Sequence, residues 1–514
     1  MKFRSCLAAA LGTLLASVAS ANVTPSALFS DHMVLQQDAA IPVWGTADAG
    51  EVVTVTLGAQ KQTATAGADK RWMVRLPKQT AGGPVEMTIA GTNSITIHDI
   101  LIGEVWVGSG QSNMTFPVSA SKGSYAGITN EAQEIAAANY PKIRMFTVRD
   151  AKGSEPLPAV AGTWEVCSPQ TVPGFSAVGY LFARDLQKEI NVPIGIVTTA
   201  VGASTAESWI SREALVADPL LKPMVDNFDA CLKAYRANPA VTLAAGTRPP
   251  WPMNKALPAA TARLGDPLRD QHEPTVDYNG MVAPIIPYAM RGVIWYQGES
   301  VCWGDSGVSN YGRVQATLIK DWRTRWGQGD FPFYIVQLPG QQNISNNPRL
   351  REQQATVLSI PNTGMACIID TGEAKNVHPH NKAPLGERLT KIALANVYGR
   401  KIEYSGPVYD SMKTDAATIR LSFTHIGGGL VAKGGPLKWF QIAGADQKFV
   451  TADAKIDGET IVVSSSQVAA PVAVRYAWDN YPDGCNLWNA ADIPAAPFRT
   501  DTWIYPLVGL TEWK

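Results

Sequence analysis

The sequence has few histidines and no excess of positive or negative charge. Both features limit the classes of function that the chain can have. Six histidines occur among 514 residues, and 44 Lys and Arg residues balance 44 Asp and Glu residues, so the formal net charge is zero. A neutral chain without a long basic run gives no indication of binding to nucleic acid or to an anionic membrane surface. An uncharged polysaccharide suits this balance at least as well as a charged ligand.

Long apolar runs are absent beyond the first twenty residues, so no membrane-spanning segment is predicted. The chain begins with a short basic stretch (1–4), and the apolar run over 6–18 falls short of the about 20 residues that a spanning helix requires. Small residues follow at 19–21, as at a signal-peptidase site. The pattern predicts a signal peptide over residues 1–21, cleaved after Ala21, and a protein that is secreted or periplasmic.

Cysteine is sparse, because five cysteines remain after that cleavage and all are widely spaced. This spacing is unlike a zinc site, and neither a metal nor an organic cofactor is predicted. An oxidising compartment permits up to two disulfides, and the odd count leaves at least one thiol outside them. The sequence leaves their pairing and the oligomeric state open.

The order of predicted elements divides the mature chain into three parts, since its length is too great for one ordinary core. Residues 22–100 read as short strands separated by turns, as in a small β-sandwich. Residues 101–400 alternate buried strands with helical stretches, which is typical of a mostly parallel sheet covered on both faces. Within them, 215–278 mixes helical pieces with Pro-rich loop and is predicted to be an insertion over the active site. Residues 401–514 return to strand patterns.

A serine follows the strongly apolar strand predicted at 104–108. Ser112 lies in the string Gly110-Gln111-Ser112-Asn113-Met114, on a turn that leaves a parallel sheet at its carboxyl edge, where ligands bind. Its N–H and a following helix N-terminus would favour negative charge there. The string lacks the second glycine of the α/β-hydrolase nucleophile elbow, and taken alone it is a turn more often than a nucleophile.

A serine nucleophile requires a base, since a neutral hydroxyl attacks poorly. Four of the six histidines fall in predicted β units, in the predicted insertion or beside a glycine turn. His378 and His380 follow the strand predicted at 365–370, and Pro379 stiffens their loop. A surface position is the simpler interpretation of either histidine taken alone.

Further motifs lie in order along the chain. They are Phe29-Ser30-Asp31-His32-Met33-Val34-Leu35-Gln36, Gly103-Glu104-Val105-Trp106, Phe175-Ser176-Ala177-Val178-Gly179-Tyr180, Tyr278-Asn279-Gly280-Met281, Trp295-Tyr296-Gln297-Gly298-Glu299-Ser300, Val377-His378-Pro379, Asn381-Lys382 and Pro497-Phe498-Arg499-Thr500-Asp501. With the serine string, this set resembles the sialate O-acetylesterase family of the SGNH-hydrolase superfamily over nearly the whole mature length. The resemblance implies a three-layer, flavodoxin-like α/β domain with flanking β-sandwich-like units. It also implies hydrolysis of acetyl esters on a glycan substrate.

The resemblance assigns roles by position. Ser112 is the nucleophile, and His378, not His380, is the general base. The N–H groups of Ser112 and Gly202 and the side-chain amide of Gln297 form the oxyanion hole, in which each donor contributes about 3 kcal/mol to transition-state binding. The implied mechanism passes through an acetyl-enzyme that water hydrolyses.

The sequence departs from the family before the catalytic histidine. An acid is usual two or three positions earlier, where Asn376 and Lys375 stand here. Asp370 is the preferred substitute as orienting acid, with Glu373, Glu299 or a backbone carbonyl as alternatives. This departure is also the feature that favours a competing class, a carbohydrate-binding protein whose catalytic site has decayed.

Residues beside these motifs are predicted to contact substrate or to support the site, namely Gln111, Asn113 and Glu299. Tryptophans are predicted to shape a sugar platform, with core packing as the alternative: Trp209, Trp251 and Trp303. The sugar itself stays open. The family name favours sialic acid, whereas relatives of this architecture are also expected to deacetylate xylan or xyloglucan, and the fold cannot separate these.

Overall fold

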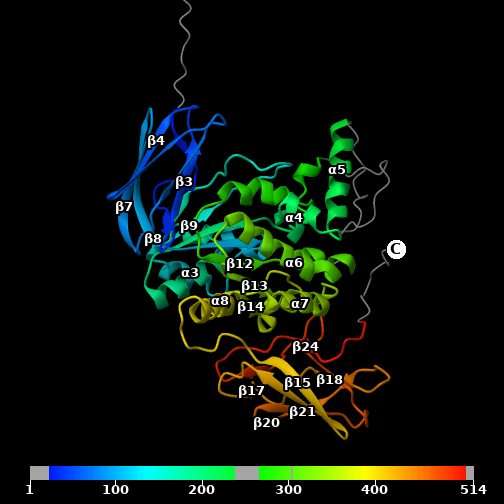
Figure 1. Ribbon diagram of the computed structural model, residues 1–514. Helices are drawn as coiled ribbons and strands as arrows, with labels where there is room; N and C mark the ends of the chain where they lie inside the picture. The colour runs from blue at the N-terminus through cyan, green and yellow to red at the C-terminus, as the bar shows by residue number, and fades with distance from the viewer. Residues whose placement is uncertain (1–21, 238–265, 303–304, 505–514) are drawn as a thin grey trace, which may run out of the picture.

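A computed structural model describes residues 22–237, 266–302 and 305–504 (Figure 1). The predicted signal peptide (1–21), Trp251, Trp303 and part of the predicted insertion lie outside the described residues. The central strands are β8 (Ser94–Gly110), β9 (Tyr140–Thr147), β10 (Trp164–Cys167), β11 (Ile194–Ala200), β12 (Gly292–Tyr296), β13 (Phe333–Gln337) and β14 (Thr363–Cys367). They form one sheet in the order β10-β9-β11-β8-β12-β13-β14, and every neighbouring pair is parallel except β10 with β9.

Helices contact both faces of this sheet. The helices are α1 (Ser112–Thr115), α2 (Glu131–Ala137), α3 (Ala177–Ile190), α4 (Arg212–Ala217), α5 (Lys222–Ala237), α6 (Asp305–Trp326), α7 (Asn347–Ala355) and α8 (Ala383–Asn396). Trp106 of β8 meets Phe182 of α3, with 5.1 Å between ring centroids, and Trp295 of β12 meets Trp322 of α6 at 6.2 Å. Trp295 pairs with Ser109, three residues beyond Trp106, so the two tryptophans leave the sheet on opposite faces.

The predicted α/β alternation is therefore present, and the chain is a mixed α/β protein. Within the described ranges, no helix is both long enough and apolar enough to cross a membrane.

Strand β8 belongs to the N-terminal β unit as well as to the central sheet. The other strands of that unit are β1 (Thr24–Pro25), β2 (Val34–Gln36), β3 (Ile41–Thr46), β4 (Val52–Leu57), β5 (Gln60–Thr65), β6 (Arg71–Leu76) and β7 (Gly82–Ala90). The first half of β8 pairs with β7 and β2, and its second half pairs with β11 and β12. The boundary predicted between residues 100 and 101 thus lies inside one continuous strand.

The C-terminal strands form three small sheets. They are β15 (Val408–Asp415), β16 (Thr418–Thr424), β17 (Leu430–Ala432), β18 (Phe440–Ala443), β19 (Val450–Thr451), β20 (Asp453–Asp457), β21 (Thr460–Ser464), β22 (Ala473–Tyr476), β23 (Leu487–Asn489) and β24 (Phe498–Arg499). The sheet orders are β15-β16-β21-β20, β17-β23 and β19-β18-β22-β24. Their inward apolar side chains form a second core, which also includes Cys367 of β14 and the nearby Ile369.

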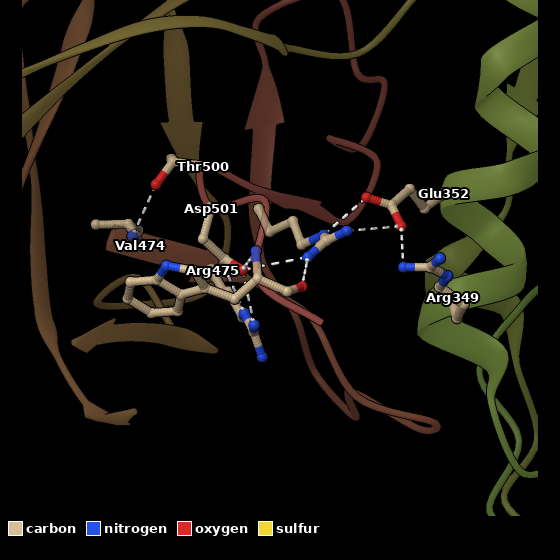
Figure 2. A network of polar contacts seen from close by, with 8 residues as sticks. Arg349, Glu352, Val474, Arg475, Thr500 and Asp501 are labelled. Atoms are coloured by element: carbon tan, nitrogen blue, oxygen red, sulfur yellow. Dashed lines mark hydrogen bonds and ion pairs between the residues drawn. The ribbon is translucent and has the colours of Figure 1, made fainter. Parts of the chain in front are cut away.

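Charged side chains join this C-terminal unit to α7 (Figure 2). Arg499 binds the Glu352 carboxylate of α7 through two hydrogen bonds of 2.7 and 3.2 Å. Asp501 accepts two hydrogen bonds from Arg475, at 2.8 and 2.9 Å, and one from Arg499 at 3.2 Å. The Pro497–Asp501 motif therefore makes an inter-unit contact.

Arg351, also on α7, makes a second contact between the two units. Its guanidinium is fully buried and donates to the carbonyls of Leu338 and Pro339, in the loop after β13, and to those of Asp479 and Asn480 in the C-terminal unit. One side chain thus fixes a loop of the central sheet against the C-terminal unit, and that loop continues into the functional site.

Asp501→Ala is expected to lower the free energy of unfolding by about 3 kcal/mol, because the change leaves buried guanidinium groups of Arg475 and Arg499 without their shared carboxylate. The Asp501 side chain is 1% exposed. Urea unfolding followed by tryptophan fluorescence measures the change. The control Asp457→Ala removes an exposed ion pair with Arg420 in the same unit and is expected to cost less than about 1 kcal/mol. Equal losses in the two variants would contradict the structural role of Asp501.

Candidate active site

Five loops that follow parallel strands meet at the carboxyl edge of the central sheet. Ser112 follows β8, Gly202 follows β11, Gln297 follows β12, Gln341 follows β13 and His378 follows β14. Among the seven central strands β8 comes first in the chain, and it lies between β11 and β12, so the strand order reverses beside it. Ligands of open α/β sheets bind at such a switch point. The sheet order explains why these distant residues share one site.

A cavity of about 370 Å³ lies beside the serine. It is lined by Gln111, Ser112, Ala203, Glu299, Ser300, Gln341, Asn343, Ile344, Lys375, Val377 and His378. Gln341 is 4% exposed, and its Oε1 accepts no hydrogen bond from the described residues. Buried amide oxygens normally have a partner, so a ligand hydroxyl would complete this one. Sequence reasoning missed Gln341 and Asn343, because no motif marks the loop after β13.

Gly110 allows the chain to turn out of β8. Its φ is +134°, and a Cβ there would lie 2.0 Å from the carbonyl oxygen of Tyr296, so only glycine fits. The Gln111 N–H donates to the same carbonyl at 2.9 Å, and helix α1 then begins at Ser112. The close approach of β8 and β12 thus places the serine hydroxyl at the sheet edge.

The hydroxyl of Ser112 contacts the imidazole of His378. Oγ lies 2.8 Å from Nε2, and the His378 ring stacks on Tyr125 with 4.7 Å between centroids and 20° between planes. His380 instead binds Glu373 through Nδ1 at 2.9 Å. The structure brings the predicted nucleophile and base together. Tyr125 is a functional candidate that no sequence motif marks.

The surroundings of His378 keep its imidazole neutral. Burial, followed by the positive charges of Lys382 and His380, lowers the pKa of His378 to about 4. A neutral imidazole accepts a proton, so at pH 7 the ring is in the form that a general base requires.

Asp370 does not contact His378, so the prediction that Asp370 is the orienting acid is wrong. Its two carboxylate oxygens accept hydrogen bonds from Arg388 at 2.6 and 2.9 Å, and Arg388 also donates to the Cys367 carbonyl at 2.8 Å. A bidentate guanidinium holds a carboxylate more strongly than a neutral ring does. Asp370 therefore ties the end of β14 to α8.

The other carboxylates considered for this role are also bound elsewhere. Glu373 accepts hydrogen bonds from the backbone and ring nitrogens of His380, and Glu299 accepts one from Asn113 Nδ2 at 2.5 Å. Across the described ranges, no carboxylate contacts Nδ1 of His378. The arrangement is a Ser–His pair without an acid.

Two backbone N–H groups beside the serine are unused. Neither the N–H of Ser112 nor that of Gly202 donates to another group in the part of the chain that the structure describes. A Cβ added to Gly202 would lie 3.8 Å from the Ser112 Cβ and 3.1 Å from the Tyr125 hydroxyl. Free N–H donors this close to a nucleophile can bind the oxyanion of a tetrahedral intermediate.

Gln297 is fully buried and lies outside the cavity lining, contrary to its predicted role as an oxyanion donor. Its Nε2 donates to the Ser204 carbonyl and to Gln111 Oε1, both at 3.1 Å, and its Oε1 accepts from the Tyr311 hydroxyl at 2.7 Å. The Ser204 carbonyl can only accept a hydrogen bond, so the nitrogen of the Gln297 amide, and not its oxygen, must face it. Both hydrogens of this amide are therefore used within the protein.

The side chain of Gln111, which lines the cavity, instead has an amide nitrogen without a partner among the described residues. Its Oε1 lies 3.2 Å from the N–H of Gly298 and 3.4 Å from that of Ser300. Backbone N–H groups only donate, so the oxygen must face them and the nitrogen of the same amide lies on the other side. Nε2 of Gln111 donates to no other described residue, and Gln111 lines the cavity next to the serine.

Trp209 is fully buried, which contradicts its predicted place in a sugar platform. Its ring packs edge-to-face on Trp295 at 6.4 Å, and its Nε1 donates to Ser204 Oγ at 2.9 Å. The ring belongs to the core and supports the loop after β11, so core packing is the correct interpretation.

The described residues contain neither a cluster of metal ligands nor a disulfide. Among the residues described, no group of three or more His, Cys, Asp and Glu side chains is placed to hold a metal ion. The described cysteines are free thiols: Cys167, Cys231, Cys302, Cys367 and Cys485.

A serine that is hydrogen-bonded to a neutral histidine, beside free backbone N–H donors, defines a site of the serine-hydrolase class. The sequence model of the family described as "carbohydrate esterase, sialic acid-specific acetylesterase" matches residues 102–242 and 260–395, more than half of the chain. The chain belongs to this family, and it is an ester hydrolase of the acetylesterase type.

Individual relatives extend the similarity over both β units. Sialate O-acetylesterase of Rattus norvegicus is 28% identical, with 91% of this chain and 92% of that protein covered. The protein of the same name from Homo sapiens is 27% identical, with 91% of each covered. The crystal structure of a carbohydrate acetylesterase from Xanthomonas citri is 34% identical with a TM-score of 0.80, and covers 94% of this chain and 100% of that one.

Proposed function

We propose that the chain hydrolyses acetyl esters on sugar hydroxyls through an acetyl-enzyme on Ser112. The observation that carries this function is the 2.8 Å hydrogen bond from the Ser112 hydroxyl to a neutral His378, beside two unused N–H donors. The relatives named sialate O-acetylesterase favour an acetylated sialic acid as the substrate. Acetylated xylan or xyloglucan is the alternative within the same chemistry.

The reaction follows from the positions of four residues. His378 Nε2 takes the proton of Ser112 as Oγ attacks the acetyl carbonyl, and the oxyanion is bound by the N–H groups of Ser112 and Gly202 and by Gln111 Nε2. The imidazolium returns the proton to the sugar oxygen, which leaves. Water then attacks the acetyl-enzyme with His378 again as base, and acetate and free Ser112 result.

Acetate release from acetylated sialic acid, xylan and xyloglucan, measured side by side, tests the substrate. Fastest release from sialic acid supports the sialate assignment, and faster release from a polysaccharide replaces it with the alternative. An enzyme that cleaves none of these, nor a simple aryl acetate, would instead be a carbohydrate-binding protein with a decayed site.

The activity is expected to persist in acid. Because the pKa of His378 is lowered to about 4, kcat/KM for an aryl acetate should stay level from neutral pH to about pH 5 and fall to half near pH 4, as the base is lost by protonation. An ordinary imidazole would reach half activity near pH 6.5. Initial rates across this range measure the profile, with circular dichroism at each pH as the control for unfolding. A half-point near pH 6.5 would contradict the environment of His378.

We further propose export and a three-part organisation. Residues 1–21 are a signal peptide, so the enzyme acts in the periplasm or outside the cell. A three-layer SGNH-type domain over 101–400, with an insertion at 215–278, carries the chemistry, and β-sandwich-like units at 22–100 and 401–514 flank it. Strand β8 is shared between the first of these units and the layered domain. Helices on both faces of the central sheet support the layered domain. Mass spectrometry of the exported protein tests the cleavage.

A further inference from the structure

Asn113 joins three segments next to the nucleophile. Its Oδ1 accepts a hydrogen bond from Lys382 Nζ at 2.5 Å, and its Nδ2 donates to Glu299 Oε1 at 2.5 Å and to the Val377 carbonyl at 3.0 Å. Val377 directly precedes His378, and Lys382 ends the same loop. One amide therefore holds the loop on both sides of the base.

Lys382 occupies a position that lysine rarely takes, since it is 1% exposed. Its Nζ lies 4.7 Å from the ring centroid of Phe116 and 5.4 Å from that of Tyr296. Burial lowers the pKa of Lys382 to about 7, although the charge of Glu299 opposes this. The amine donates a hydrogen bond in both its charged and its neutral form, so its contact with Asn113 persists across neutral pH.

Glu299 lies on the opposite side of Asn113. Its Oε2 is buried and without a hydrogen-bond partner among the described residues. Burial raises the pKa of Glu299, while the hydrogen bond from Asn113 and the charge of Lys382 oppose the rise. Two buried ionisable groups on either side of one amide stabilise each other, and removing one leaves the other uncompensated.

We propose that Lys382 is a positioning residue that holds the His378 loop against the nucleophile through Asn113. It thereby takes the place of an orienting acid, which the described residues do not supply. The role rests on the proposed esterase function. In the described part of the chain no carboxylate contacts Nδ1 of the base, so the loop backbone and the stacked Tyr125 must place the ring. Asn376 holds the backbone of His378 locally, through its Oδ1 at 3.0 Å and its Nδ2 at 2.9 Å. The contacts that tie this loop to the segment carrying the nucleophile are made at Val377 and at Lys382, and both end on Asn113.

Lys382→Met removes the Nζ donor and keeps most of the buried volume. We expect kcat for an aryl acetate to fall on the order of 30-fold while KM changes less than about threefold, because the base is misplaced and the cavity is not. The half-point of kcat/KM in acid should rise by about one pH unit, since a positive charge facing His378 is lost. His380 on the same loop and Glu299 across Asn113 remain in place.

The double variant Glu299→Gln with Lys382→Met separates positioning from packing. It removes both buried ionisable groups, so its melting temperature should recover relative to Lys382→Met, whereas kcat should stay low because the contact from Nζ to Asn113 is still missing. Recovery of kcat together with the melting temperature would overturn the proposal. A kcat of Lys382→Met within about threefold of wild type would also overturn the proposal. Lys188→Met, on the exposed face of α3, is the control and should change neither quantity.

A fluorophosphonate probe separates this inference from the proposed function. The probe reacts with an activated serine without any acetylated substrate, and intact mass gives the labelling rate. Labelling of the wild type without acetate release would remove the esterase function alone. Lys382→Met should then still label on the order of 30-fold more slowly than wild type, and an equal rate would overturn the positioning role.

Discussion

Replacing Ser112 with alanine is expected to lower kcat for acetate release by at least about 10⁴-fold, because no acetyl-enzyme can form without Oγ. The expected residual rate comes from the N–H donors, which the change leaves in place. Ser112 is 8% exposed, and within the described ranges its hydroxyl makes one hydrogen bond, to His378. Loss of that bond should cost about 1 kcal/mol, so the variant should remain folded.

The matched control for this change is Ser121→Ala. Ser121 is exposed, and its hydroxyl oxygen lies 2.9 Å from that of Ser119, within hydrogen-bond distance. Loss of the Ser121 hydroxyl should leave kcat unchanged. Rapid quenching followed by intact mass should show an acetyl adduct on the wild type and on Ser121→Ala, and none on Ser112→Ala. An adduct that survives in Ser112→Ala would place the nucleophile elsewhere.

The central sheet was predictable because parallel strands covered on both faces read as continuous apolar runs. The run at 333–337 is the observed β13, and the helical stretch from Ala383 is the observed α8. The continuity of β8 was not predictable in this way. Exposed side chains alternate with partly or fully buried ones over residues 94–98, and all side chains from residue 100 to Gly110 are buried. The pattern changes at residue 100 although the backbone does not end, and the predicted boundary followed the pattern.

The nucleophile and the base were predictable because they lie in motifs of fixed local form. The partners of the other side chains depend on residues far away in sequence. Asp370 lies only eight residues before His378, yet Arg388 from the next helix holds it with two hydrogen bonds. Gln297 lies in a matching motif, but the Ser204 carbonyl, 93 residues away, fixes its amide.

The burial of Lys382 could not be predicted from the sequence either. The residue stands in a recognised motif, and composition alone would put a lysine on the surface. Its burial follows from three neighbours that the sequence does not place together: Asn113 after β8, Glu299 after β12 and the ring of Phe116. The charge environment of the base is therefore a property of the sheet order, which brings the loops together, rather than of any single motif.

Replacing His378 with alanine is expected to lower kcat/KM on the order of 10⁴-fold at pH 7, close to the effect of losing the nucleophile, because the two residues act as a unit. The variant should keep its melting temperature, since among the described residues the ring makes one hydrogen bond, to Ser112, a stacking contact with Tyr125 and a tilted contact with Phe116. Added imidazole should restore part of the rate, because the change leaves a ring-sized space between Tyr125 and the Ser112 hydroxyl.

His380→Ala is the matched control two residues along the same loop. His380 is exposed, and its ring binds Glu373 rather than the serine, so kcat/KM should stay within about threefold of wild type. The two variants differ in which imidazole is removed, and of the two rings it is that of His378 that contacts the serine. Equal losses would mean that the loop tolerates no change and that neither ring is identified as the base. A loss confined to His380→Ala would assign the base to the other histidine and overturn the geometry on which the mechanism depends.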